Sequence, residues 1–278
     1  MRHWLIRLTA AALLGLPWAM ATAEDSSADS IIKKVMAQSH TERQIKGIAD
    51  FAIAELDLRK EVLEAKDYQE LKTILNSAFD SKKLHQDVTQ VWKKRFQAER
   101  FEKWSAQLQS PLLTKMSRLE LQVSSNQGFE DMMAFAERQK SKPPTQARQD
   151  LIARLDSATA SSELALRGQL AVLSAFLKAI NPSLPDNKQL NDTTLQKVLD
   201  ATRAQIEPSL REIATLTYLY TYRNVSDADL STYVSAYESD VGKWFMQLNR
   251  DSISDALTAA TQRAKKLIEQ HLQAKKAA

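Results

Sequence analysis

The chain carries one apolar pattern twice, and this repetition constrains the fold more than any other feature. The two copies pair as follows: Phe101, Trp104, Leu108, Leu112, Met116 and Leu119 with Leu230, Tyr233, Tyr237, Val241, Phe245 and Leu248. Every residue of the second set follows its counterpart by 129 positions, as Leu230 follows Phe101. Apolar residues that recur at intervals of three and four occupy one face of an α-helix. The pattern therefore predicts a helical unit that was duplicated within the chain.

A second pair of matching segments lies upstream, at a spacing of 121 residues. Its members are Ile45, Ala49, Ala52 and Leu56 in the first segment and Leu166, Leu170, Leu173 and Leu177 in the second. Gly47 corresponds to Gly168 inside these segments. The spacing grows from 121 to 129 farther along, and the stretch "NPSLPDNK" at residues 181–188 has the length and the turn-forming residues of an inserted loop.

The border between the two copies lies at the stretch "RQKSKPPTQAR". Its Pro143-Pro144 pair cannot continue a helix and predicts a short, stiff connection. We therefore expect the first copy over residues 24–142 and the second over residues 143–278. Each is long enough for a small helical bundle. The two bundles either pack as one pseudo-symmetric body or move independently, and the sequence leaves this open.

Composition predicts an all-α fold. Only Gly47, Gly128, Gly168 and Gly242 occur after residue 23, and the good helix formers Ala, Leu, Lys, Gln, Glu and Arg dominate. One stretch, "TLTYLYTY" at residues 215–222, alternates β-branched and aromatic residues as a strand does. It nevertheless continues the apolar series of the preceding residues, and no second strong strand could pair with it. We expect a helix there, followed by a new helix capped by Ser226.

The first residues have the features of a secretory signal peptide. Arg2 and Arg7 form a short basic region, an apolar run follows from Leu8 to about Ala21, and Ala21-Thr22-Ala23 is an Ala-x-Ala cleavage site. The run is shorter than the roughly 18 residues that span a bilayer, which disfavours the alternative of a signal anchor. We expect a signal peptide over residues 1–23, cleavage after Ala23 and a periplasmic protein. No later stretch is apolar enough to span a membrane.

Several classes of function are disfavoured by what the chain lacks. It has no Cys, which excludes disulfides, thiolate metal sites and Cys nucleophiles. The net charge of +4 includes Arg2 and Arg7, and a near-neutral mature chain disfavours nucleic acid as a partner. His40, His85 and His271 belong to no metal-binding motif. Phosphate loops, nucleophile elbows and dinucleotide fingerprints are also missing. We therefore expect no metal, no cofactor and no recognisable catalytic residue.

The stretch "VSDADLSTYVSAYESDVGKWF" resembles the hallmark of the domain-of-unknown-function 2059 family. The residues that fit its pattern are Val225, Ser226, Asp227, Asp229, Leu230, Tyr233, Tyr237, Ser239, Val241 and Gly242. Asp240 stands where the family prefers Pro, and Lys243 comes one place early. The resemblance covers residues 225–250, and residues 96–119 form a degenerate second copy that keeps Ser110, Pro111 and Lys115. It implies small all-helical proteins of Gram-negative bacteria that are usually exported, and no known reaction.

A Ser-Pro-x-Gly motif suits a tight turn between two helices. A hydroxyl accepts from a free amide, Pro fixes φ, and Gly allows a close approach or a positive φ. We therefore interpret the motif residues as structural: Tyr233, Tyr237, Ser239, Gly242, Lys243, Trp104, Ser110 and Pro111. The alternative is that Tyr233, Tyr237 and Trp244 flank a groove that binds a ligand.

Three hypotheses about function remain. The favoured one is an exported interaction or accessory protein that binds an envelope protein or a peptide. The second is a peptidoglycan-directed enzyme that uses a pair of carboxylates. The third is a binder of the membrane surface through the basic end "RAKKLIEQHLQAKKAA". Carboxylates such as Glu207, four residues before Arg211, are typical of surface helix pairs, so binding is favoured over catalysis.

Overall fold

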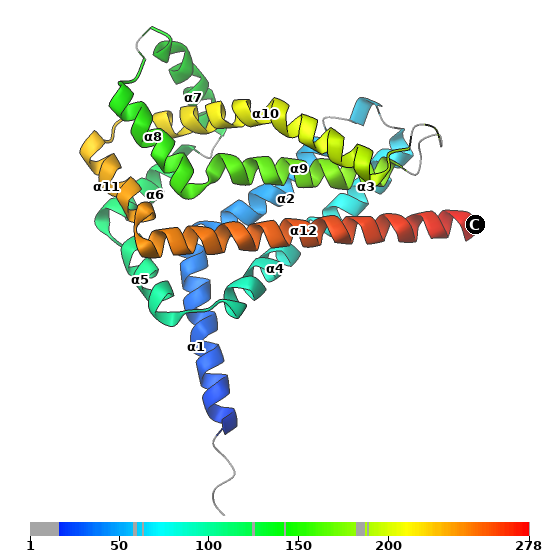
Figure 1. Ribbon diagram of the computed structural model, residues 1–278, viewed down its shortest axis with the longest axis horizontal. Coiled ribbons are helices and arrows are strands. Elements are labelled where there is room, and N and C mark those ends of the chain that lie inside the picture. The colour runs from blue at the N-terminus through cyan, green and yellow to red at the C-terminus, as the bar shows by residue number, and fades with distance from the viewer. Residues whose placement is uncertain are drawn as a thin grey trace, which may run out of the picture.

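The computed structural model describes residues 17–57, 60–62, 64–123, 126–141, 143–181, 187 and 189–277. All regular structure in these residues is helical, so the predicted all-α fold is confirmed (Figure 1). The elements are α1 Pro17–Gln38, α2 Thr41–Asp57, the short 3-10 helix Lys60–Val62, α3 Ala65–Ala78, α4 Ser81–Lys94, α5 Ala98–Leu108, α6 Pro111–Val123, α7 Asn126–Gln139, α8 Gln146–Thr159, α9 Ser161–Ile180, α10 Asp192–Thr221, α11 Asp227–Glu238 and α12 Asp240–Ala277.

The strand-like stretch belongs to helix α10, as predicted. Its β-branched residues are accommodated because the hydroxyls of Thr217 and Thr221 bond to the carbonyls of the preceding turn, at 2.8 and 2.7 Å. Pro208 lies inside α10. The next helix begins where the capping pattern predicts, because Ser226 Oγ accepts from the amide of Asp229 at 3.1 Å.

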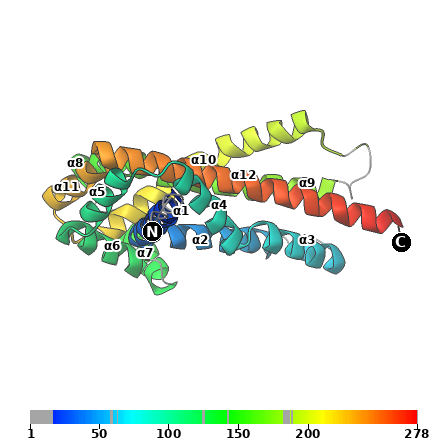
Figure 2. The same cartoon turned by 90° about the horizontal axis from the view of Figure 1, so that it is seen from below.

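The helices are arranged around the long helix α12. It contacts α3, α4 and α5 from the first half of the chain and α8, α9 and α11 from the second. Figure 2 shows α3 and the beginning of α10 on opposite sides of it. Its aromatic anchor is Phe245, whose ring centroid lies 5.4 Å from that of Trp92 and 5.2 Å from that of Trp104. The main core is therefore built jointly by residues of both halves.

A second apolar cluster lies at the end of the molecule where α5, α6, α8 and α11 meet. It combines Met116 of α6 with Ile152 and Leu155 of α8 and with Leu230 of α11. The α6 helix of the first half therefore packs on the second half, while α12 of the second half packs on the first. The described residues of the two predicted copies, 24–142 and 143–278, thus share their cores and pack together.

The turns α1–α2 and α8–α9 resemble each other. His40 and Ala160, which are 120 residues apart, both lie in the left-handed region, with φ of 58° and 53°. The hydroxyls of the two residues that flank His40 lie 2.8 Å apart, and those that flank Ala160 lie 2.9 Å apart. This likeness supports the predicted duplication, which stays a prediction. Both turns face the cavity described below.

Some predicted features fall outside the described residues. They include residues 1–16 of the predicted signal peptide and most of the inserted loop predicted at 181–188. The remaining signal-peptide residues, 17–23, belong to the beginning of α1, which projects from the body in Figure 1. Among the described residues, no helix combines the length and the apolar character that crossing a membrane requires.

Candidate functional site

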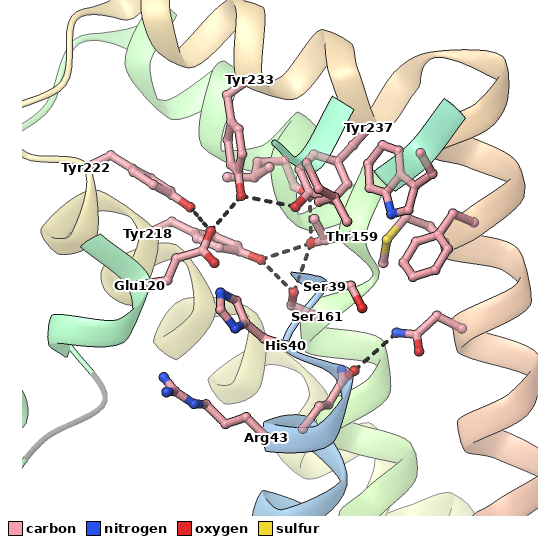
Figure 3. A pocket seen from close by; sticks show the side chains of 17 residues that line it. Ser39, His40, Arg43, Glu120, Thr159, Ser161, Tyr218, Tyr222, Tyr233 and Tyr237 are labelled. Carbon is pink, nitrogen blue, oxygen red and sulfur yellow. Dashed lines mark hydrogen bonds between the residues drawn. The ribbon is translucent and has the colours of Figure 1, made fainter. Parts of the chain in front are cut away.

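A cavity of about 300 Å³ lies between the two left-handed turns and the helices of both halves. Its wall includes four tyrosines: Tyr218 and Tyr222 from the end of α10, and Tyr233 and Tyr237 from α11. Glu120 of α6 lies among them (Figure 3). The apolar part of the wall comes from α5, α8 and α12, so side chains that are distant in sequence enclose one space.

Glu120 is the centre of a hydrogen-bond network. The hydroxyls of Tyr222 and Tyr233 both donate to its Oε1 atom, at 2.5 and 2.6 Å. The hydroxyl of Tyr237 lies 3.1 Å from that of Tyr233. Because a phenol has a single proton and Tyr233 gives its proton to the carboxylate, Tyr237 is the donor in this last bond. Three tyrosines are thereby fixed around one carboxylate.

Tyr218 belongs to a second cluster on the neighbouring wall. Its hydroxyl lies 2.5 Å from Ser161 Oγ and 2.9 Å from Thr159 Oγ1, at the turn between α8 and α9. Thr159 also donates to the carbonyl of Leu155 at 2.9 Å. The three hydroxyls therefore bind one another and tie the end of α10 to the start of α9.

The tyrosines of the cavity hold their protons more strongly than exposed tyrosines do. Burial is the main cause of the raised pKa of Tyr222 and of Tyr233, and the nearby charge of Glu120 adds to both. Burial likewise raises the pKa of Tyr218 to about 12 and that of Tyr237 above its usual range. At neutral pH all four are therefore uncharged hydrogen-bond donors and acceptors.

The wall contributed by α12 carries an amide at a position related to that of Glu120. Asn249 is buried, donates from Nδ2 to Gln44 Oε1 at 3.1 Å and accepts from Thr41 Oγ1 at 3.4 Å. It follows Glu120 by 129 residues, which is the spacing of the repeated apolar pattern. The cavity thus has a carboxylate on one side and an uncharged amide on the other.

Trp104 supplies an unused hydrogen-bond donor. It is 0 % exposed, forms part of the wall, and its indole N–H has no acceptor among the described residues. The other buried tryptophan of this core, Trp92, donates to Ser252 Oγ at 3.0 Å. A buried donor without an acceptor is costly, on the order of 1–3 kcal/mol. Trp104 therefore marks a position where an acceptor from a bound molecule would be favourable.

Two basic side chains lie at the lower end of the site in Figure 3. His40 Nε2 is 2.5 Å from Ser117 Oγ, and its ring lies beneath Glu120. Arg43 is exposed and extends farther from the tyrosine hydroxyls. The other two histidines of the described residues contact carboxylates elsewhere, His85 with Glu42 at 3.9 Å and His271 with Glu70 at 2.9 Å.

The structure places only some of the motif residues of the sequence at the cavity. Trp104, Tyr233 and Tyr237 line the cavity. Trp244, which we considered as a groove residue, is not part of that wall. Its ring packs edge-on against Phe101, with 5.2 Å between the centroids. Lys243 is exposed and also lies outside the wall.

The remaining motif residues build the turns that position the tyrosines. Ser239 Oγ accepts from the amide of Gly242 at 3.1 Å between α11 and α12. A Cβ atom on Gly242 would lie 2.3 Å from the carbonyl oxygen of Ala236, so this turn requires glycine for close approach rather than for a positive φ. In the first half, Pro111 opens α6 and Ser110 Oγ accepts from the following helix at 3.4 Å.

The wall residues that were not singled out as site residues from the sequence include Glu120, Tyr218, Tyr222 and Asn249. Two signals could have found them. Tyr218 and Tyr222 are four residues apart, like Tyr233 and Tyr237, and so each pair shares a helix face. Glu120 and Asn249 are related by the spacing of the repeat.

No family model, no curated protein and no solved structure matches this chain. The resemblance of residues 225–250 to the domain-of-unknown-function 2059 family therefore stays a prediction. Within the described part of the chain, no three His, Asp or Glu side chains are grouped as a metal ion would require.

Proposed function

We propose that this protein is an exported, periplasmic interaction protein that holds a peptide, or a segment of a partner protein, in the cavity around Glu120. The observation that carries the proposal is the buried indole N–H of Trp104, which lacks an acceptor in the wall of a cavity about 300 Å³ in volume. A cavity of this size fits one amino-acid residue. Fixed polar groups on an apolar wall are typical of a binding site.

The cavity supports binding better than catalysis. Glycoside cleavage needs two carboxylates that face each other across the substrate. Glu120 is the one carboxylate in the described wall of the cavity, and its Oε1 atom already accepts two tyrosine hydroxyls. A peptidoglycan-directed enzyme is therefore the weaker hypothesis.

Binding to a membrane surface through the basic end is also less supported. Arg263 donates to Asp87 at 2.7 Å and to the carbonyl of Ala78 at 3.0 Å, so it serves the fold. Lys265 lies 3.9 Å from Glu269 on the same helix. Part of the positive charge at this end is thus neutralised within the molecule.

Export is tested by the N-terminus of the mature protein. We expect the protein in the periplasmic fraction of a Gram-negative host, with Glu24 as its first residue in N-terminal sequencing. A chain that keeps Met1 and stays in the cytoplasmic fraction would contradict this part of the proposal.

Binding is tested with a pool of tryptic peptides from an envelope extract. The protein is mixed with the pool and passed through a gel-filtration column, and co-eluting peptides are identified by mass spectrometry. Leu108→Trp fills the cavity and should abolish retention, whereas Leu112→Trp, the same change four residues later and outside the wall, should not. Circular dichroism checks that both variants are folded.

Two results would overturn the proposal. One is that the wild-type protein retains no peptide. The other is that Leu108→Trp, shown to be folded, retains the same peptides as the wild-type protein. Met246→Trp, on the α12 side of the wall, provides a second blocking variant if Leu108→Trp does not fold.

A further inference from the structure

The tyrosine network has little left to donate to a bound molecule. The protons of Tyr222 and Tyr233 go to Glu120, and that of Tyr237 goes to Tyr233. The hydroxyls of Tyr218 and Ser161 bond within their own cluster. Each hydroxyl has one proton and two lone pairs, so the capacity that remains on this wall consists of lone pairs. This wall therefore favours a ligand group that donates hydrogen bonds.

Charge and aromatic rings on the same wall favour a cation. Glu120 places a carboxylate at the centre of the network, and rings of Tyr222, Tyr233 and Tyr237 surround it (Figure 3). Aromatic faces attract an ammonium group, most strongly where it is shielded from water. An ammonium group also carries three donors and no acceptor, which matches the lone pairs of the hydroxyls.

Trp104 requires a hydrogen-bond acceptor from the ligand, whereas the tyrosine network requires a donor. Its buried N–H needs an acceptor, and none is present among the described residues. Its ring centroid lies 5.4 Å from that of Tyr237, so the unused donor and the tyrosine network belong to adjacent parts of one wall. A ligand that satisfies both carries an ammonium group and, next to it, a carbonyl oxygen.

An apolar groove of about 290 Å³ continues from the cavity between α2 and α9. The two share Gln44 and Ser161 as lining residues. Apolar residues of the groove include Phe51 and Leu164. Gly168 lies in its wall, and a Cβ added there would meet no atom within 4 Å. The groove therefore has room for an apolar side chain of a molecule whose polar end lies in the cavity.

We infer that the site recognises an α-ammonium group next to a carbonyl, with an apolar side chain directed into the groove. This chemistry is shared by a free apolar amino acid and by the first residue of a peptide with a free N-terminus. The inference rests on the proposed function and names the part of the partner that is bound. The cavity takes the ammonium and the carbonyl, and the groove selects the side chain.

Isothermal titration calorimetry with three ligands tests the inference and separates the two sources. The ligands are leucine, the dipeptide Leu-Gly and N-acetyl-Leu-Gly. We expect acetylation to weaken binding at least about tenfold, since it removes the charge that Glu120 would attract. Binding of Leu-Gly alone identifies a peptide N-terminus, and binding of leucine alone identifies a free amino acid.

The outcomes separate this inference from the proposed function. If the acetylated dipeptide binds as well as Leu-Gly, or if peptides retained from the pool have blocked amines, the ammonium assignment is overturned while peptide binding stands. If none of the three ligands binds, the inference is overturned, and the peptide pool decides the proposed function on its own.

Point variants assign the two polar contacts. Glu120→Gln keeps an acceptor for the tyrosines but removes the charge, and should weaken Leu-Gly binding about tenfold or more. Trp104→Phe keeps a ring but removes the donor, and should weaken it about two- to tenfold. Trp92→Phe is the matched control, because its N–H bonds to Ser252 and it lies outside the cavity wall.

A further variant tests the groove. Gly168→Leu projects a side chain into the groove and should abolish binding of Leu-Gly while leaving Gly-Gly, which has no side chain to place there, bound as by the wild-type protein. Unchanged affinity of Glu120→Gln for Leu-Gly would overturn the ammonium assignment. Unchanged affinity of Gly168→Leu for Leu-Gly would overturn the assignment of the groove.

Discussion

The hydroxyl of Tyr233 donates to Glu120 across 113 residues of sequence, at 2.6 Å. This bond connects α11 in the second half of the chain with α6 in the first. Tyr222, at the end of α10, donates to the same oxygen. Glu120, which we place at the centre of the binding site, therefore also links helices α6, α10 and α11.

We predict that Glu120→Ala destabilises the protein strongly. The substitution removes the acceptor of two buried hydroxyls, Tyr222 and Tyr233, and each unsatisfied group costs about 1–3 kcal/mol. The free energy of unfolding, measured by urea denaturation, should fall by about 2–5 kcal/mol. The matched control is Glu102→Ala on the exposed face of α5, which should leave stability close to that of the wild-type protein.

The stability of Glu120→Gln provides a second test of the role of Glu120 in the fold. Glu120→Gln keeps an oxygen that can accept from the tyrosines, so its stability should lie between those of Glu120→Ala and the wild-type protein. If Glu120→Ala costs no more than Glu102→Ala, the network does not hold α6, α10 and α11 together.

Alkaline pH should destabilise the fold through the tyrosines. The pKa of Tyr218 is raised from the ordinary 10.0 to about 12, and those of Tyr222 and Tyr233 are also raised. The folded state therefore binds these protons more tightly than the unfolded state does. Stability is fully present below pH of about 10 and falls as the pH rises beyond it, because the unfolded tyrosines lose their protons first.

Urea denaturation at a series of pH values between 8 and 11, with tyrosinate absorbance recorded in parallel, measures this effect. Tyr222→Phe removes one of the shifted groups and should give a shallower decline above pH of about 10. A free energy of unfolding that stays constant up to pH 11 would show that the tyrosines titrate alike in both states.

Gly242→Ala should distort the turn between α11 and α12. The added Cβ would lie 2.3 Å from the carbonyl of Ala236 and 2.7 Å from that of Tyr237, and neither backbone atom can move cheaply. Overpacking of this kind typically costs about 1–3 kcal/mol. Gly47→Ala in α2, where a Cβ meets nothing within 4 Å, is the matched control and should stabilise by up to about 1 kcal/mol.

Thermal denaturation of the two variants gives the comparison directly. The melting temperature should fall for Gly242→Ala and should rise or stay constant for Gly47→Ala. Equal changes in the two variants would mean that α11 and α12 can separate slightly at no cost, and that the glycine is not needed for close approach.

The helices could be predicted because their signals are local. Residues 215–222 look like a strand by composition, but the apolar series that they continue has the helical period, and the threonine hydroxyls find carbonyls within the same helix. The start of α11 could likewise be predicted, because the capping residue Ser226 accepts from the amide of Asp229, only three residues away. Such interactions need no knowledge of which helices are neighbours.

The site could not be predicted because its contacts are not local. Glu120 stands in "RLELQ", which resembles many surface helix stretches, and the tyrosines that bind it come 102 and 113 residues later. They meet only because α6 packs on the second half of the chain while α12 packs on the first. The apolar period of α6 and that of α12 show which face of each helix is buried, but they do not specify which half of the chain covers that face.

Arg148 should prove essential for placing the cavity tyrosines. From α8 it donates to the carbonyl of Val225 at 3.0 Å, to Asp227 at 2.7 Å and to the carbonyl of Tyr222, and its side chain is only 11 % exposed. It thus holds the turn between α10 and α11 against α8. Arg148→Met keeps most of the apolar stem but removes the guanidinium donor from the carbonyl of Val225 and from Asp227, while the carbonyl of Tyr222 still accepts from the amide of Val225 at 2.8 Å. The substitution should cost about 2–4 kcal/mol in urea denaturation.

Arg154→Met is the matched control for this last prediction. Arg154 is also on α8 and donates to both carboxylate oxygens of Glu238 on α11, at 3.0 and 2.6 Å, but the two side chains are 47 % and 34 % exposed, so water weakens the pair. Its replacement should therefore have a clearly smaller effect. Hydrogen exchange should show faster opening of the α10–α11 turn in Arg148→Met alone. If both variants lose equal stability, charge rather than the carbonyl contacts joins α8 to α11, and the tyrosines must be positioned by apolar packing.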